Sequence, residues 1–123
     1  MEISRARHKE NLDRALILEQ LEGNAELLTE LAQLFLEEAP QLIEAMRKAL
    51  RQGDMKDLAR SAHSMKGAAG NFFAHGTVSA ASQLEDDAKR GDVEAAKAGL
   101  ATLEAIVDHL LTELTNLWQG SPK

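Results

Sequence analysis

Apolar residues recur at intervals of three and four along most of this chain, the spacing of one face of an α-helix. The pattern is most regular near the C-terminal end, in a stripe formed by Val93, Ala96, Leu100, Leu103, Val107, Leu110, Leu114 and Leu117. This stripe predicts a long amphipathic helix over 92–118 that packs against other helices.

A second long stretch has the same spacing, with apolar positions at Leu28, Leu31, Phe35, Leu42, Met46 and Ala49. It predicts a helix over 24–52. Pro40 lies inside this stretch and removes one backbone donor, so we expect the helix to be kinked.

Three shorter stretches predict helices over 12–21, 54–74 and 77–90, the last of them capped by Thr77. The pairs Gly53-Asp54 and Gly91-Asp92 each join a residue suited to end one helix to a residue suited to begin the next. The connections are therefore short, and consecutive helices should be antiparallel.

Together these elements predict an all-α fold, an antiparallel four-helix bundle with an additional short N-terminal helix. The bundle should occupy residues 12–118, and the polar ends 1–11 and 119–123 should be flexible segments. A chain of 123 residues is large enough for one hydrophobic core but not for two. We expect a monomer.

Composition narrows the functional classes. The net charge of -6 argues against non-specific binding to nucleic acid, and the absence of cysteine removes disulfides and thiolate metal sites. No apolar run approaches the roughly 20 residues that cross a bilayer, and the N-terminal residues are polar. We therefore expect a cytoplasmic protein without membrane insertion that binds other proteins.

The helix over 54–74 carries the candidate chemistry. Its apolar stripe is formed by Leu58, Ala62, Met65, Ala69 and Phe72, which places His63 on the opposite, solvent-facing side. An exposed imidazole is largely neutral near pH 7, so a ring nitrogen keeps a lone pair that can attack an electrophile such as a phosphoryl group.

Two glycines share the face of His63. At 100° per residue, Gly67 lies about 40° and Gly70 about 20° from His63 around the helix. Each glycine costs a helix about 1 kcal/mol relative to alanine. Close packing of a neighbouring helix is one explanation, but the exposed phase favours close approach by another macromolecule.

Positive charge lies on the same face, at Lys56, Arg60 and Lys66. Such a stripe is often only the solvated side of an amphipathic helix. Its coincidence with His63 and the two glycines favours a functional surface, on which Lys66 could neutralise phosphoryl oxygens.

The run from Ala62 to Asn71, AHSMKGAAGN, resembles the signature of histidine-containing phosphotransfer (HPt) domains, which serve multistep His-to-Asp phosphorelays. The resemblance extends from about Leu12 to Leu117. It includes the runs FLEEAP at 35–40 and QLE at 83–85.

This resemblance implies that His63 accepts a phosphoryl group from a receiver-domain aspartate and donates it to another receiver's aspartate. It also implies that Lys66 assists by its charge and that Gly67 makes space. The partners would be the receiver domains of a hybrid sensor histidine kinase or of a response regulator. We expect their contact surface to comprise Lys56, Ala59, Arg60, Gly67, Gly70 and Asn71.

No cofactor is expected on this chain, since Mg²⁺ would lie in the acidic pocket of the partner receiver. Two positions depart from the usual pattern of the family. Met65 stands where leucine is common, and Phe73 stands where glycine is frequent. Phe73 should alter how its helix ends rather than how His63 reacts.

Three other functions compete with this interpretation. A non-phosphorylated helical adaptor could use the same basic face for docking alone, without needing His63. A self-contained enzyme is disfavoured because the chain has no P-loop, no glycine loop or metal-binding motifs of kinases, and no tight cluster of acidic residues. A metal site is weakly supported, because His8, His63, His75 and His109 show no metal-binding spacing.

Overall fold

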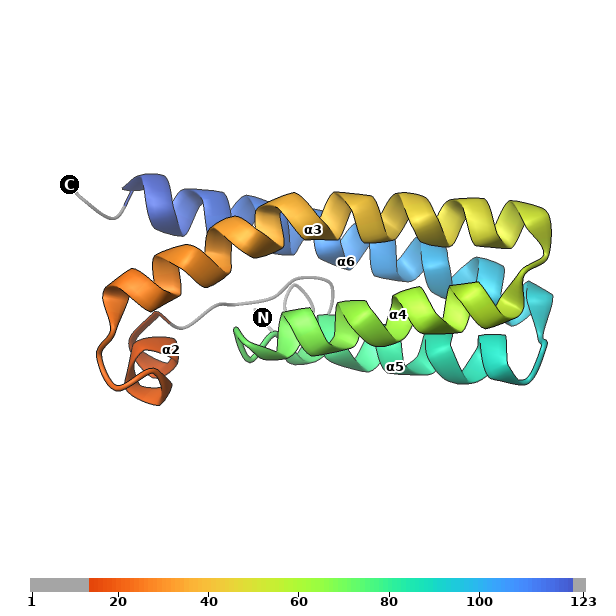
Figure 1. The fold of residues 1–123 in the computed structure, drawn as a ribbon, viewed down its shortest axis with the longest axis horizontal. Helices are drawn as coiled ribbons and strands as arrows, with labels where there is room; N and C mark the ends of the chain where they lie inside the picture. The colour runs from red at the N-terminus through yellow and green to blue at the C-terminus, as the bar shows by residue number, and fades with distance from the viewer. Residues whose placement is uncertain (1–13, 121–123) are drawn as a thin grey trace, which may run out of the picture.

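The computed structural model describes residues 14–120, with side chains described over 15–116. Within this range the chain forms helices only: α2 (Arg14–Gln20), α3 (Ala25–Gln52), α4 (Met55–Gly70), α5 (His75–Lys89) and α6 (Val93–Gly120). Figure 1 shows α3 to α6 side by side and alternating in direction, with α2 beside the start of α3. The predicted all-α bundle with an extra N-terminal helix is confirmed.

Side-chain caps begin three of the helices. The side chains of Asn24, Asp54 and Asp92 accept hydrogen bonds from backbone N–H groups three residues further on, at 2.9, 3.0 and 3.1 Å. Gly53 and Gly91 both have φ of 71°, the left-handed conformation that ends a helix at little cost for glycine. Both predicted Gly-Asp boundaries are confirmed.

Helix α3 is continuous through Pro40. In Figure 1 its first half is inclined to its second half, in keeping with the expected kink. Proline removes one hydrogen bond of the ladder, which allows this change of direction without breaking the helix.

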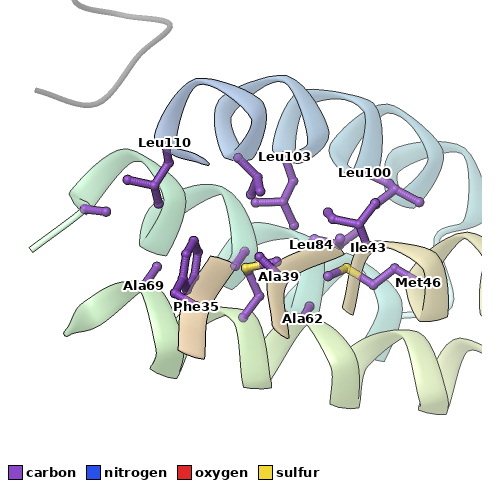
Figure 2. Close-up of a cluster of buried hydrophobic side chains, with 14 of the residues drawn as sticks. Phe35, Ala39, Ile43, Met46, Ala62, Ala69, Leu84, Leu100, Leu103 and Leu110 are labelled. Carbon is purple, nitrogen blue, oxygen red and sulfur yellow. The ribbon is translucent and has the colours of Figure 1, made fainter. Parts of the chain in front are cut away.

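A single apolar core fills the space between the four long helices (Figure 2). It includes Phe35 and Phe72, whose rings meet edge to face with centroids 5.7 Å apart. The predicted stripe of α6 is buried from Ala96 to Leu114. Val93 is 44% exposed and does not belong to the core, because it lies at the first turn of the helix.

The connection between α4 and α5 differs from the prediction. Helix α4 ends at Gly70 rather than at 74, and α5 begins at His75 rather than at 77. Thr77 is buried inside α5 instead of capping it, and Ala74 occupies the N-cap without a side-chain hydrogen bond.

Phe73 accounts for this early helix end. Its φ of 56° lies in the left-handed region, which glycine adopts without steric cost and which stops an α-helix. The ring is partly buried against the core, so packing stabilises a conformation that phenylalanine otherwise disfavours. This explains why glycine would suit the position.

The ends of the chain are only partly described. Helix α6 continues to Gly120, two residues beyond the predicted end, so 119 and 120 are helical rather than part of a tail. Residues 1–11 and 121–123, predicted as flexible, lie outside the described residues, as do the first two residues of the helix predicted over 12–21. None of the described helices is long and apolar enough to span a membrane.

Candidate functional site

His63 lies on the outer face of α4, where its side chain is 67% exposed. The inner face of the helix is fixed against the core by Leu58, Ala62, Met65 and Ala69. Because successive residues of a helix are 100° apart, burial of these four positions turns His63 outward beside α5. The predicted exposure of the imidazole is confirmed.

Glu85 of α5 holds the imidazole from one side. His63 Nδ1 lies 3.2 Å from Glu85 Oε2 and 3.4 Å from Oε1. The carboxylate is almost fully buried, with a side-chain exposure of 8%, although it borders the exposed histidine. Helices α4 and α5 therefore build the site together.

Two lysines complete the charge balance around the buried carboxylate. Lys66 Nζ lies 3.0 Å from Glu85 Oε1, and Lys89 Nζ lies 3.0 Å from Oε2. Hydrogen bonds from Lys66, which has the larger effect, and from Lys89 lower the pKa of Glu85 to about 2, although burial acts to raise it. Glu85 is thus an anion throughout the physiological pH range.

This arrangement sets the tautomer of His63. An ionised carboxylate can only accept hydrogen bonds, so the Nδ1 facing Glu85 must carry the proton. In the neutral ring the lone pair then resides on Nε2, the nitrogen not engaged by Glu85. The exposed ring can therefore present Nε2 as a nucleophile to a group arriving from solvent.

Sequence reasoning placed Lys66 and His63 at the site but assigned no role to Glu85 or Lys89. A signal was present, because Glu85 falls in the apolar stripe of α5 beside Ala81, Leu84 and Ala88. A buried acid at such a position requires cationic partners. Lys89 lies one turn further along the same helix, whereas Lys66 reaches Glu85 only because α4 packs against α5.

The two glycines of α4 lie open to solvent. A Cβ atom at Gly67 or Gly70 would have no neighbour within 4 Å beyond the adjacent residues and the helix's own backbone. Neither glycine is therefore required for packing between the described helices. The structure supports the prediction that these positions leave the surface beside His63 free of side chains.

The remaining predicted contact residues divide into two groups. Lys56, Ala59 and Arg60 line a groove that reaches His63, and Arg60 also pairs with Asp57 at 3.1 Å. Asn71 is exposed at the C-cap of α4, on the other flank of the helix. Ala59 is buried rather than exposed, since α5 packs beside it, and it contributes only to the floor of the groove.

The other histidines do not join His63. His75 is the first residue of α5, and its ring lies 6.5 Å from that of Phe73. His109 is exposed on α6, and His8 lies outside the described residues. Among residues 14–120, no three histidine or acidic side chains gather as metal ligands would.

An outward-facing imidazole, oriented by a buried carboxylate on a rigid helical bundle, is the arrangement of a protein that carries a group on histidine. Comparison with known proteins agrees. The family model described as the Hpt domain matches residues 30–119. A search of curated proteins found no match.

The fold also resembles the crystal structure of histidine-containing phosphotransfer protein B from Pseudomonas aeruginosa PAO1, with a TM-score of 0.81. The two sequences are 24% identical, and the alignment covers 88% of this chain and 94% of the other. At this identity the likeness establishes the fold.

The family model spans most of the length of this chain, so the chain belongs to the Hpt domain family. It is a histidine phosphotransfer intermediate of phosphorelay signalling. Members of this family are phosphocarriers rather than kinases, and they interact with the receiver domains of their relay partners.

Proposed function

We propose that His63 is the residue that carries the phosphoryl group, and that Nε2 is the atom to which phosphorus binds. The contact that carries this proposal is the 3.2 Å approach of His63 Nδ1 to the buried Glu85 carboxylate. It supports a proton on Nδ1 and a lone pair on Nε2.

In the forward step, Nε2 of His63 attacks the phosphorus of a receiver's aspartyl phosphate. The N–P bond forms as the bond between phosphorus and the aspartyl oxygen breaks, and the electron pair stays on the departing carboxylate. The phosphorylated ring keeps its Nδ1 proton and becomes cationic. Glu85, already an anion, stabilises this charge.

The reverse step delivers the phosphoryl group to another receiver. An aspartate oxygen attacks phosphorus, the N–P bond breaks, and the electron pair returns to Nε2 as the neutral tautomer. No proton enters or leaves the imidazole in either direction, because Glu85 accepts the Nδ1–H hydrogen bond before and after transfer.

Lys66 assists by its charge. Its side chain is 31% exposed and one helical turn from His63, so the ammonium group can hydrogen-bond phosphoryl oxygens while it remains near Glu85. The bare surface at Gly67 and Gly70 supports close approach of the receiver's aspartate, which in-line transfer requires.

The partners proposed are receiver domains of a hybrid sensor histidine kinase, of a response regulator, or of both. Mg²⁺ would belong to the receiver's acidic pocket, and the chain itself would need no cofactor and have no ATP-dependent kinase activity. We further propose that it acts as a cytoplasmic monomer.

The test is phosphoryl transfer from a radiolabelled receiver domain in the presence of Mg²⁺. The wild-type chain should acquire a label that is lost in acid and stable in alkali, as a phosphoramidate bond is. His63→Gln should acquire none, whereas the matched controls His75→Gln and His109→Gln should be labelled like the wild type.

Equal labelling of His63→Gln would move the acceptor to another residue and refute the assignment. The alternative of a docking adaptor makes the opposite prediction. If receivers bind the wild-type chain but none from a broad panel labels it, the non-phosphorylated adaptor is favoured.

A further inference from the structure

Three hydrogen-bonding groups share the two oxygens of the Glu85 carboxylate. Lys66 Nζ lies 3.0 Å from Oε1. Lys89 Nζ lies 3.0 Å from Oε2, and His63 Nδ1 lies 3.2 Å from the same oxygen. A carboxylate has about four lone-pair positions, so it can accept all three hydrogen bonds at once. Each lysine thus bonds a different oxygen, and His63 lies nearer to the oxygen that Lys89 bonds.

The two lysines lie on opposite sides of the pair formed by His63 and Glu85. Lys66 follows His63 by one turn of α4. Lys89 follows Glu85 by one turn of α5. Because these neighbouring helices run in opposite directions (Figure 1), the two turns lead away from the pair towards opposite ends of the bundle. The two exposed glycines of α4 lie on the Lys66 side. A phosphoryl donor that approaches over these glycines therefore meets Lys66 rather than Lys89.

Lys66 has two acceptors to serve during transfer. In the structure its ammonium group bonds Glu85, but its assistance to transfer requires hydrogen bonds to phosphoryl oxygens. The phosphoryl group binds Nε2, and the outward bonds of the two ring nitrogens point in different directions. Hydrogen bonds from Lys66 to the phosphoryl oxygens therefore weaken its bond to Glu85. A carboxylate that is only 8% exposed is costly to leave without a cation.

We propose that Lys89 is a positioning residue of phosphoryl transfer, which holds the Glu85 carboxylate at His63 Nδ1 while Lys66 turns to the phosphoryl group. The inference rests on the proposed function, in which Glu85 orients His63 and Lys66 assists transfer. Lys89 suits this role because it lies four residues after Glu85 on the same helix, so its bond needs no contribution from α4. Lys89 stays bonded to Oε2 throughout, and neither ammonium group gives up a proton.

The loss of Lys89 has a specific consequence for Lys66. Glu85 would then attract Lys66 alone among its two lysine partners, and this attraction opposes the movement of Lys66 to the phosphoryl group. Transfer should slow, although Lys89 touches neither the phosphoryl group nor the reacting nitrogen. The effect should disappear when position 85 carries no charge, because Lys66 is then free to turn. Lys89 and Glu85 should therefore be coupled in their effects on the rate.

The experiment measures the initial rate at which phosphoramidate, a small donor that needs no docking surface, labels His63. Nε2 takes the phosphoryl group as the P–N bond of the donor breaks, and ammonia departs with the electron pair. Lys89→Met, which removes the charge but keeps an unbranched side chain, is made in the wild-type chain and in Glu85→Gln. Lys89→Arg keeps the charge, and Lys97→Met, at an exposed lysine of α6, is the matched control. Each variant is first checked for folding by circular dichroism and thermal unfolding.

Lys89→Met should slow labelling by about 3- to 10-fold in the wild-type chain and by less than about twofold in Glu85→Gln. Lys89→Arg and Lys97→Met should stay within about twofold of the wild type. Equal slowing in both backgrounds would mean that Lys89 acts on the phosphoryl group directly, and it overturns the positioning role. An unchanged rate in Lys89→Met, or a rate in Lys89→Arg as low as in Lys89→Met, also overturns it and leaves the role of His63 intact. Failure of phosphoramidate and of receivers to label His63 in the wild-type chain refutes the proposed function itself.

Discussion

Glu85 offers the sharpest test of how the site is held together, through the substitution Glu85→Gln. Glutamine has almost the same shape, and its side-chain carbonyl can still accept the hydrogen bond from His63 Nδ1. The negative charge is lost, however, and the ammonium groups of Lys66 and Lys89 lose their common partner. The substitution therefore separates charge from geometry.

The size of the effect follows from the pKa. Lowering the pKa of Glu85 from 4.5 to about 2 corresponds to at most about 3–4 kcal/mol in favour of the folded state, at about 1.4 kcal/mol per pH unit. The Lys66 and Lys89 side chains are 31% and 62% exposed, so solvent screens both pairs. We expect Glu85→Gln to lose about 1–2 kcal/mol of unfolding free energy at pH 7.

The pH dependence has a definite sign. Because folding lowers the pKa of Glu85, its ionised form stabilises the protein fully above about pH 4.5, and this contribution declines as the pH falls towards about 2. Urea unfolding of wild type and Glu85→Gln should therefore differ most near pH 7, and the difference should shrink between pH 4.5 and 2. Comparing the two proteins at each pH cancels the other carboxylates.

Glu37→Gln is the matched control, an exposed glutamate of α3 that should change stability by less than about 0.5 kcal/mol. A difference between Glu85→Gln and wild type that is the same at pH 3 as at pH 7 would refute the electrostatic argument. In the transfer assay Glu85→Gln should remain a phosphoacceptor but react more slowly, since the cationic ring of phosphohistidine loses its counter-ion.

Substitutions at three further positions test other parts of the structure. Gly67→Ala should raise the melting temperature, since an exposed glycine inside a helix costs about 1 kcal/mol. Gly67→Leu should fold normally but accept the phosphoryl group from a receiver slowly. Unfolding of either variant would mean that Gly67 is needed for packing. Glu22→Gly should stabilise the protein by about 0.5–1 kcal/mol in urea unfolding, because Glu22 is exposed with φ of 58°; a loss of stability would contradict this strain. Leu103→Ala should cost about 2–5 kcal/mol, since Leu103 is fully buried; a cost below 1 kcal/mol in the same assay would mean that the core collapses around the cavity.

Local patterns in the sequence determined most of the fold. The three-four spacing identified every helix that the structure describes, and the Gly-Asp pairs located two of the turns. The prediction was wrong at the α4–α5 connection, because the apolar spacing of α4 continues past Gly70, where the helix ends. Phe73 adopts a left-handed conformation there because its ring packs on the core. The helix propensities of the residues in this segment could not predict that tertiary contact.

In the candidate site, too, some residues were predicted from the sequence and others were found only in the tertiary structure. Helical phase alone placed His63, Gly67 and Gly70 on one exposed face, because exposure on a single helix depends only on which positions are apolar. Glu85 and Lys89 lie on another helix, and nothing local relates them to His63. Only the packing of α5 against α4 brings the carboxylate within 3.2 Å of Nδ1, and that contact decides which ring nitrogen is free to react.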